Sequence, residues 1–252
     1  MLRSMFPKGD LTSASILATV AASWGILLAW TSSPYSAYLG HSELAEVSSV
    51  VQLLPLSLGF FAGWIVMLFA MMIPAAAPFV TQFRLRKSGE GLLLPLLGGY
   101  LATWALFGLM AYFSDLGLHR LSETSLLQGH AWVFGPSALV LAAGYQFTST
   151  KNQFLKDCCY PSDFIQSHWT GQGGGFSALR LGFAYGKSSL GSGWAVMLLM
   201  FALGLGSVLW MLAFALVMMA EGLTEWGPRI RLPLGVVLAG IAFYSVVVAI
   251  GL

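Results

Sequence analysis

Two neighbouring cysteines and a histidine carry the clearest potential for chemistry in this sequence. Cys158, Cys159 and His168 lie in one polar stretch between two apolar runs. Thiolate and imidazole groups are ligands of zinc and copper in proteins, so the three residues form a candidate metal site. The alternative is structural: the cysteines would be small, half-buried residues in a reducing compartment, and His168 would be hydrogen-bonded locally.

Methionine sulfur atoms form a second candidate. Met67, Met71 and Met72 lie in a long apolar segment without charged residues. Thioethers select Cu(I), but methionine is also a common gap-filler in apolar cores. We therefore interpret these methionines as core residues.

The same segment has the features of a closely packed membrane helix. Pro74 and Pro78 each remove a backbone donor, so we expect the helix to kink near Met71 or to end early. Gly59 and Gly63 are separated by three residues, a spacing that lets neighbouring helices approach closely. The segment predicts a kinked helix with a packing face.

The composition places these residues in an integral membrane protein. Hydrophobic residues make up 57% of the chain and charged residues 9%, and the mean hydropathy is +0.78. Soluble domains have about 25% charged residues. No linker-like stretch divides the chain, so we expect one all-α domain over residues 1–252, a polytopic bundle of transmembrane helices. The small net charge of +2, from scattered basic residues, argues against nucleic acid as a partner.

Six apolar runs are long enough to cross a hydrocarbon core of about 30 Å. None of them contains Asp, Glu, Lys, Arg or His. This absence argues against an ion-coupled transporter, which keeps ionisable residues within the membrane. The predicted spans are residues 14–30, 56–81, 92–114, 131–148, 190–220 and 232–252.

The distribution of lysine and arginine predicts that both termini are cytoplasmic. In this orientation nine of the 12 basic residues lie inside, in agreement with the positive-inside rule. Glu221 would lie outside. The predicted inner group is Arg3, Lys8, Arg84, Arg86, Lys87, Lys151, Lys156, Arg180 and Lys187, and the outer group is Arg120, Arg229 and Arg231.

The predicted outer face also gathers histidines and carboxylates. Such a face could bind a cation, because these groups are metal ligands. The positive-inside bias alone also leaves acidic residues in outer loops, and we favour that interpretation. The residues concerned are His41, His119 and His130 with Glu43, Glu46, Asp115, Glu123, Glu221 and Glu225, and the histidines with Asp115 and Glu123 are the best candidates for an acid–base set.

Residues 149–189 read as a long cytoplasmic loop between two spans. A connection of this length in a bundle often has a function. Its last part, from Phe176 to Tyr185, could lie at the membrane interface or enter the protein as a re-entrant segment.

In these features the sequence resembles a bacterial family of predicted metal-binding integral membrane proteins of unknown function. The resemblance covers residues 60–222 and implies a multi-pass protein of the bacterial inner membrane. Three blocks carry it: Trp64 to Pro78; Gly144 to Gln146 through to His168 and Trp169; and Leu190, Gly191, Trp194 to Met197, Trp210, Met211 and Glu221.

The family pattern implies thiolate ligands that this chain mostly lacks. It has a cysteine pair in the long loop, at positions that are Phe154 and Cys158 here. It also has a Cys-x-x-Cys-Cys group before Trp194, where this chain has Ser189, Ser192 and Gly193. A complete family-type site is therefore not expected. Cys158, Cys159 and His168 remain as ligands for a smaller copper or zinc site.

We weigh three functions on these grounds. A catalytic cysteine would need an activating base that the sequence does not identify, so we assign no catalytic residue. A non-catalytic accessory subunit or assembly factor of a membrane complex explains most features, with lipids and other integral membrane subunits as partners. The metal link suggests, by analogy, a copper monooxygenase-type complex. The alternative is a permease for a small solute or a metal ion.

Overall fold

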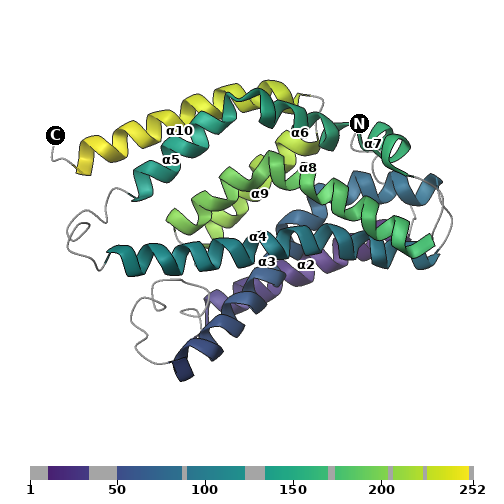
Figure 1. Cartoon of the computed structure of the whole chain (residues 1–252), viewed down its shortest axis with the longest axis horizontal. Coiled ribbons are helices and arrows are strands. Elements are labelled where there is room, and N and C mark those ends of the chain that lie inside the picture. The colour runs from purple at the N-terminus through teal and green to yellow at the C-terminus, as the bar shows by residue number, and fades with distance from the viewer. Residues whose placement is uncertain are drawn as a thin grey trace.

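The computed structural model describes residues 11–33, 50–86, 90–122, 134–169, 174–203, 207–223 and 226–249. Within these ranges every regular element is a helix, so the predicted all-α class is confirmed (Figure 1). The elements are α2 (Leu11–Thr31), α3 (Val50–Arg86), η3 (Glu90–Leu92), α4 (Leu93–Ser122), α5 (Phe134–Gln146), α6 (Ser149–Cys159), α7 (Pro161–His168), α8 (Gly174–Leu203), α9 (Val208–Leu223) and α10 (Gly227–Ala249).

Four helices are long and apolar enough to cross a membrane: α2, α3, α4 and α10. They correspond to four of the six predicted spans. Many of their large apolar side chains are exposed, which suits contact with lipid rather than water. The predicted span 131–148 contains α5, whose 13 residues are fewer than the roughly 20 that a helical span needs.

The predicted span 190–220 is wrong, because the chain reverses direction within it. Helix α8 ends at Leu203, α9 begins at Val208, and the two helices pack against each other (Figure 1). Both helices are apolar, so hydropathy does not separate them. Gly204, Gly206 and Ser207 were the available sequence signal for a break.

The predicted loop 149–189 is also wrong, because α6, α7 and the first half of α8 fill most of it. Local signals specify these helices. The side chain of Thr148 accepts a hydrogen bond from the Lys151 amide and caps α6, and Pro161 occupies the first turn of α7. Gly174 opens α8 with a φ of 52°, a conformation that favours glycine. Helices α6 and α7 have low hydropathy, so a search for apolar runs in the sequence does not detect them.

Helix α3 continues through its prolines. It runs unbroken for 37 residues with Pro55, Pro74 and Pro78 inside it, so the predicted early end does not occur. The Tyr100 hydroxyl of α4 donates a hydrogen bond of 3.2 Å to the Met72 carbonyl, close to the prolines. Of the predicted packing residues, Gly63, Met71 and Met72 are buried, whereas Gly59, Pro74 and Pro78 are half-buried.

Helices α4 and α8 approach each other closely, because glycines replace side chains where they meet. A Cβ atom on Gly99 would overlap the Leu179 carbonyl oxygen, and one on Gly182 would overlap the Leu96 carbonyl oxygen. Four residues after Gly182, a Cβ on Gly186 would lie 2.5 Å from the Thr103 hydroxyl oxygen. The α8 half of this small-residue contact lies in the predicted loop 149–189, so the sequence does not reveal the contact.

Polar contacts overturn part of the predicted membrane sidedness. The Lys151 Nζ atom lies 2.8 Å from Glu221 Oε2, so these residues cannot lie on opposite sides of a membrane. Arg231 donates to the carbonyls of Gln146 and Thr148 at 2.8 and 3.2 Å, which places it at the same end. The additional chain reversal between α8 and α9 brings Glu221 and Arg231 to the same end of the bundle as Lys151.

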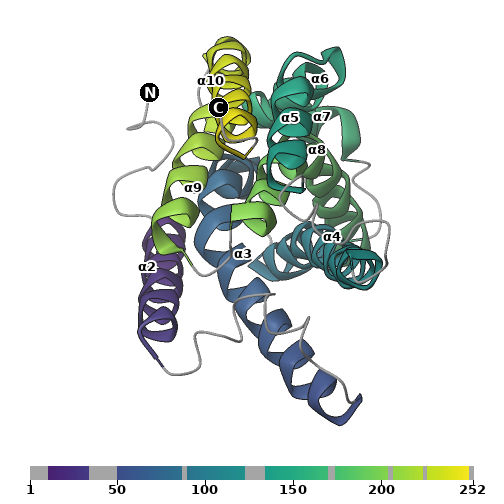
Figure 2. The ribbon, with the colours of Figure 1, turned by 90° about the vertical axis from the view of Figure 1, so that its left-hand side faces the viewer.

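This correction changes the expected position of the C-terminal helix. Arg229 and Arg231 join the basic residues of α6, which strengthens the charge asymmetry that the positive-inside rule uses. With that end cytoplasmic, α10 ends at the opposite end of the bundle, contrary to the predicted inner position (Figure 1). Helix α9 packs against both α10 and α3 (Figure 2). The cytoplasmic assignment itself stays a prediction.

The glycine contact predicts a large difference between neighbouring substitutions. Gly99→Ala and Gly182→Ala should each destabilise the bundle by about 1–3 kcal/mol, because backbone must move to accommodate the methyl group. Gly98→Ala is the matched control, since its Cβ would lie 4.0 Å from the Leu179 side chain. Thermal unfolding of the purified protein in detergent measures the effect. Equal melting temperatures for G98A and G99A would contradict the contact.

Candidate functional site

A small cavity lies where α3, α4, α6, α8 and α9 meet. Its volume is about 30 Å³, which is room for one or two water molecules or a metal ion. The polar or sulfur-bearing residues in its wall include Met72, Cys158, Tyr185, Ser189, Ser192, Met218 and Glu221.

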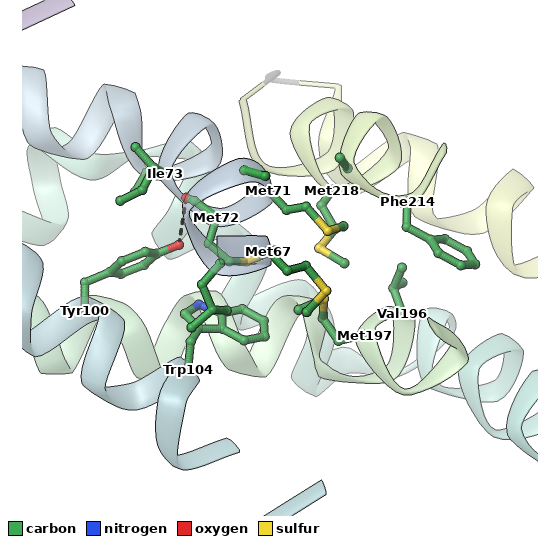
Figure 3. Close-up of a cluster of buried hydrophobic side chains, with 14 of the residues drawn as sticks. Met67, Met71, Met72, Ile73, Tyr100, Trp104, Val196, Met197, Phe214 and Met218 are labelled. Atoms are coloured by element: carbon green, nitrogen blue, oxygen red, sulfur yellow. Dashed lines mark hydrogen bonds between the residues drawn. The ribbon is translucent and has the colours of Figure 1, made fainter. Parts of the chain in front are cut away.

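Three residues with sulfur-bearing side chains line this cavity, each from a different helix. Cys158 of α6 carries a thiol, and Met72 of α3 and Met218 of α9 carry thioethers. All three residues are buried. Figure 3 shows Met72 and Met218 entering the same apolar region from their two helices. A thiol with two thioethers is a donor set that suits Cu(I), whereas Mg²⁺ and Ca²⁺ prefer oxygen ligands.

The cavity also collects the positions at which the family resemblance implied thiolates. Ser189, Ser192 and Gly193 of α8 line it together with Cys158. The Cys158 sulfur lies 3.8 Å from the Ser192 hydroxyl oxygen, and Ser189 contacts the Tyr100 hydroxyl at 3.2 Å. Four of the five implied positions therefore meet at the cavity, whereas Phe154 is not part of its wall, and Cys158 alone among the five carries sulfur.

The other two predicted ligands do not join Cys158 to form a cluster. The Cys159 sulfur lies 3.5 Å from the Glu221 backbone oxygen, outside the cavity wall. His168 is exposed, stacks on Phe164 at 4.1 Å, and its Nδ1 atom lies 2.9 Å from the Ser167 hydroxyl. Among the described residues, no three His, Cys, Asp or Glu side chains form a metal-binding group.

Burial suppresses the reactivity of both thiols. Desolvation raises the pKa of Cys158 to about 12, and Ser192 offsets only part of this effect. Desolvation, together with the nearby Glu221 carboxylate, raises the pKa of Cys159 to about 11. Both residues are therefore protonated near neutral pH, and a metal that binds either sulfur as a thiolate must displace a proton.

A buried ion pair holds the cavity together and was missed by the sequence analysis. Lys151 Nζ donates to both carboxylate oxygens of Glu221, at 3.0 and 2.8 Å. Their side chains are only 1% and 3% exposed. Burial lowers the pKa of Lys151, and the attraction of Glu221 opposes that shift. The pair joins α6 to α9 directly beside the cavity, because Glu221 is part of its wall.

A helical spacing in the sequence could have revealed half of this arrangement. Lys151, Leu155 and Cys158 recur at intervals of four and three residues, so they share one face of α6, and all three are buried. Nothing in the sequence pairs this face with Glu221, which follows an apolar run 70 residues later. Glu221 becomes the partner of Lys151 because the chain reverses at the end of α8.

The alternative outer-face site lies outside the described residues. His41, His130 and Glu123 are not described, and the side chains of Asp115 and His119 are not described either.

The ion pair predicts strong coupling between two substitutions. Lys151→Met or Glu221→Met alone should destabilise the protein by about 3–5 kcal/mol, because each leaves the other side chain's charge buried without its partner. The double variant Lys151→Met/Glu221→Met should recover most of this loss. Thermal unfolding of the single and double variants measures the coupling. Additive effects would show that the two side chains do not interact.

The raised thiol pKa values predict slow alkylation of the folded protein. At about pH 8 the thiolate fraction of each cysteine should be at least a hundredfold lower than that of a free cysteine, whose pKa is about 8.5. Iodoacetamide labelling, followed by mass spectrometry, should be slow before and fast after denaturation in SDS. Cys159 should react before Cys158, which is more deeply buried. Rapid labelling of Cys158 in the folded protein would contradict its placement.

Sequence comparisons connect this geometry to a known family. The profile of a family described as "PpoB2: Copper chaperone" matches residues 61–245. No curated protein and no solved structure gives a significant match. The matched range contains every residue of the cavity wall and agrees with the predicted link to a metal-related family. Because this range covers well over half of the chain, the protein belongs to the PpoB2 copper chaperone family.

Proposed function

We propose that this protein is a membrane accessory protein that holds Cu(I) in the cavity and passes it to a copper-dependent partner. One observation carries the proposal: Cys158, Met72 and Met218, each with a sulfur-bearing side chain, line the same cavity. The family description supports copper as the metal. Copper is the cargo here, so no catalytic step is assigned to the protein.

The donor set favours Cu(I) over zinc. A structural zinc site takes four ligands from Cys, His, Asp or Glu, and the described residues provide no cluster of even three. Thioethers are suitable ligands for Cu(I), so Met72 and Met218 can supplement a single cysteine. A site with one thiolate holds copper less firmly than a thiolate cluster, which suits a protein that must release its cargo.

The partner is expected to be another integral membrane protein. Helices α2 and α10 expose large apolar side chains along their length, which can contact lipid or a neighbouring subunit. A copper monooxygenase-type complex in the bacterial inner membrane is the host that the family resemblance suggests. Co-purification in mild detergent tests this part of the proposal. A protein that always isolates as a solitary monomer would argue against a stable complex.

Copper affinity should depend on one cysteine and respond to a neighbouring serine. Cys158→Ser should weaken Cu(I) binding at least about tenfold, which is about 1.4 kcal/mol. Ser192→Cys should strengthen it, because its side chain lies 3.8 Å from the Cys158 sulfur. Anaerobic competition with a coloured Cu(I) chelator measures both changes.

A matched control separates the cavity from a general effect of added thiols. Ser137→Cys introduces a thiol at an exposed position of α5, away from the cavity wall. It should leave the affinity of the cavity for Cu(I) unchanged. The proposal fails if C158S binds Cu(I) like the original protein, or if S137C and S192C change the affinity equally.

A copper permease is the second candidate, favoured by the buried Lys151 and Glu221 pair. Ionisable residues inside a membrane protein often mark a path for ions. Uptake of radioactive copper into proteoliposomes distinguishes the two functions. The accessory protein binds copper without filling the vesicle lumen, whereas a permease accumulates it there and loses this activity with Glu221→Gln.

A further inference from the structure

We propose that Met67, Met71 and Met197 form a second Cu(I) site, made of thioethers alone, that exchanges copper with the cavity through Met218. This inference rests on the proposed function, in that Cu(I) is the cargo. It adds a second binding site for copper, farther into the helix bundle.

The methionines of the core are confined to three helices. Seven methionines are buried among the described residues, and all belong to α3, α8 or α9. Helices α2, α4, α5 and α10 also contribute buried side chains, but these are aliphatic or aromatic residues and the polar residues Ser23, Thr103 and Gln146. General gap-filling would be expected to spread methionine over all of them. The seven residues are Met67, Met71, Met72, Met197, Met200, Met211 and Met218.

The helical period divides these methionines between the cavity and the second site. Met67 and Met71 are four residues apart, so they project from one face of α3. Met72 is rotated by about 100° from Met71 and borders the cavity instead. In Figure 3, Met67 and Met71 extend toward Met218 of α9, and Met197 of α8 lies beside them.

The second site is displaced from the cavity in a consistent direction along two helices. On α8, Met197 follows the cavity residue Gly193 by one turn, about 6 Å. On α3, Met67 precedes Met72 by about 7.5 Å. Met218 lines the cavity and also contributes to the methionine cluster in Figure 3, so it is the shared residue between the two sites.

The surroundings select a soft, singly charged metal ion. Val196 and Phe214 lie beside the cluster in Figure 3, and both are buried apolar residues. The three proposed ligands are neutral and at most 2% exposed, so the site holds no counter-charge and excludes water. Divalent ions would lose far more hydration energy there than Cu(I), and thioethers offer them poor compensation.

A cysteine-free variant isolates the second site. The original protein should bind two equivalents of Cu(I) under anaerobic conditions, and Cys158→Ser/Cys159→Ser should retain one. X-ray absorption at the copper edge should show only sulfur ligands for the retained ion. Adding Met71→Leu in this background should remove that ion, because leucine preserves volume but has no donor atom.

Met211→Leu is the matched control. Met211 is buried on the same helix as Met218, about 10 Å away along the helix axis. Its substitution by leucine should therefore leave the retained copper in place. Leucine for methionine costs less than about 1.5 kcal/mol, so folding should persist, and size-exclusion chromatography checks this. Met67→Leu and Met197→Leu repeat the test at the other ligands.

The possible results separate this inference from the proposed function. Loss of all copper from the cysteine-free protein would overturn the second site and leave the cavity site standing. Retained copper with nitrogen or oxygen ligands, or equal losses for M71L and M211L, would also overturn it. Absence of Cu(I) binding by the original protein would overturn the proposed function itself.

Discussion

The buried ion pair between Lys151 and Glu221 determines how the rest of the cavity is assembled. It joins the short polar helix α6 to the apolar helix α9 at a place with almost no solvent. Two charges removed from water are costly unless they meet with good geometry, so the pair tolerates few other arrangements of these helices. Fixing Lys151 also fixes the face of α6 that carries Cys158, and fixing Glu221 positions Met218 one turn away.

The opposite wall depends on a different constraint, the close approach of α4 and α8. Gly99 and Gly182 allow the two backbones to touch, where any larger residue would separate them. In lipid, such van der Waals contact is a main source of helix association, since no hydrophobic force acts between apolar helices. Ser189 and Ser192 follow Gly182 on α8, so this contact sets their distance from Cys158.

Together these constraints form a small cavity. Although most of the implied cysteines are missing, its wall still carries soft sulfur ligands. Serine and glycine occupy three of the implied thiolate positions, yet Met72 and Met218 add sulfur-bearing side chains from other helices. A neutral thioether needs no proton to leave before it binds a metal, unlike the buried thiols, whose pKa values are raised. A site in which thioethers replace thiolates is suited to reversible binding of Cu(I), which is the role we propose.

The sequence alone determined the membrane class, the all-α fold, the helices α2, α3, α4 and α10, and Cys158 as a candidate metal ligand. These follow from hydropathy and helix length, which are local properties. Only the tertiary structure decided that the run 190–220 reverses, that the loop 149–189 is helical, and that His168 stays apart from the cysteines. It also decided that Glu221 meets Lys151. The reason is physical: a turn between two apolar helices leaves hydropathy almost unchanged, but it reverses which residues share an end of the bundle.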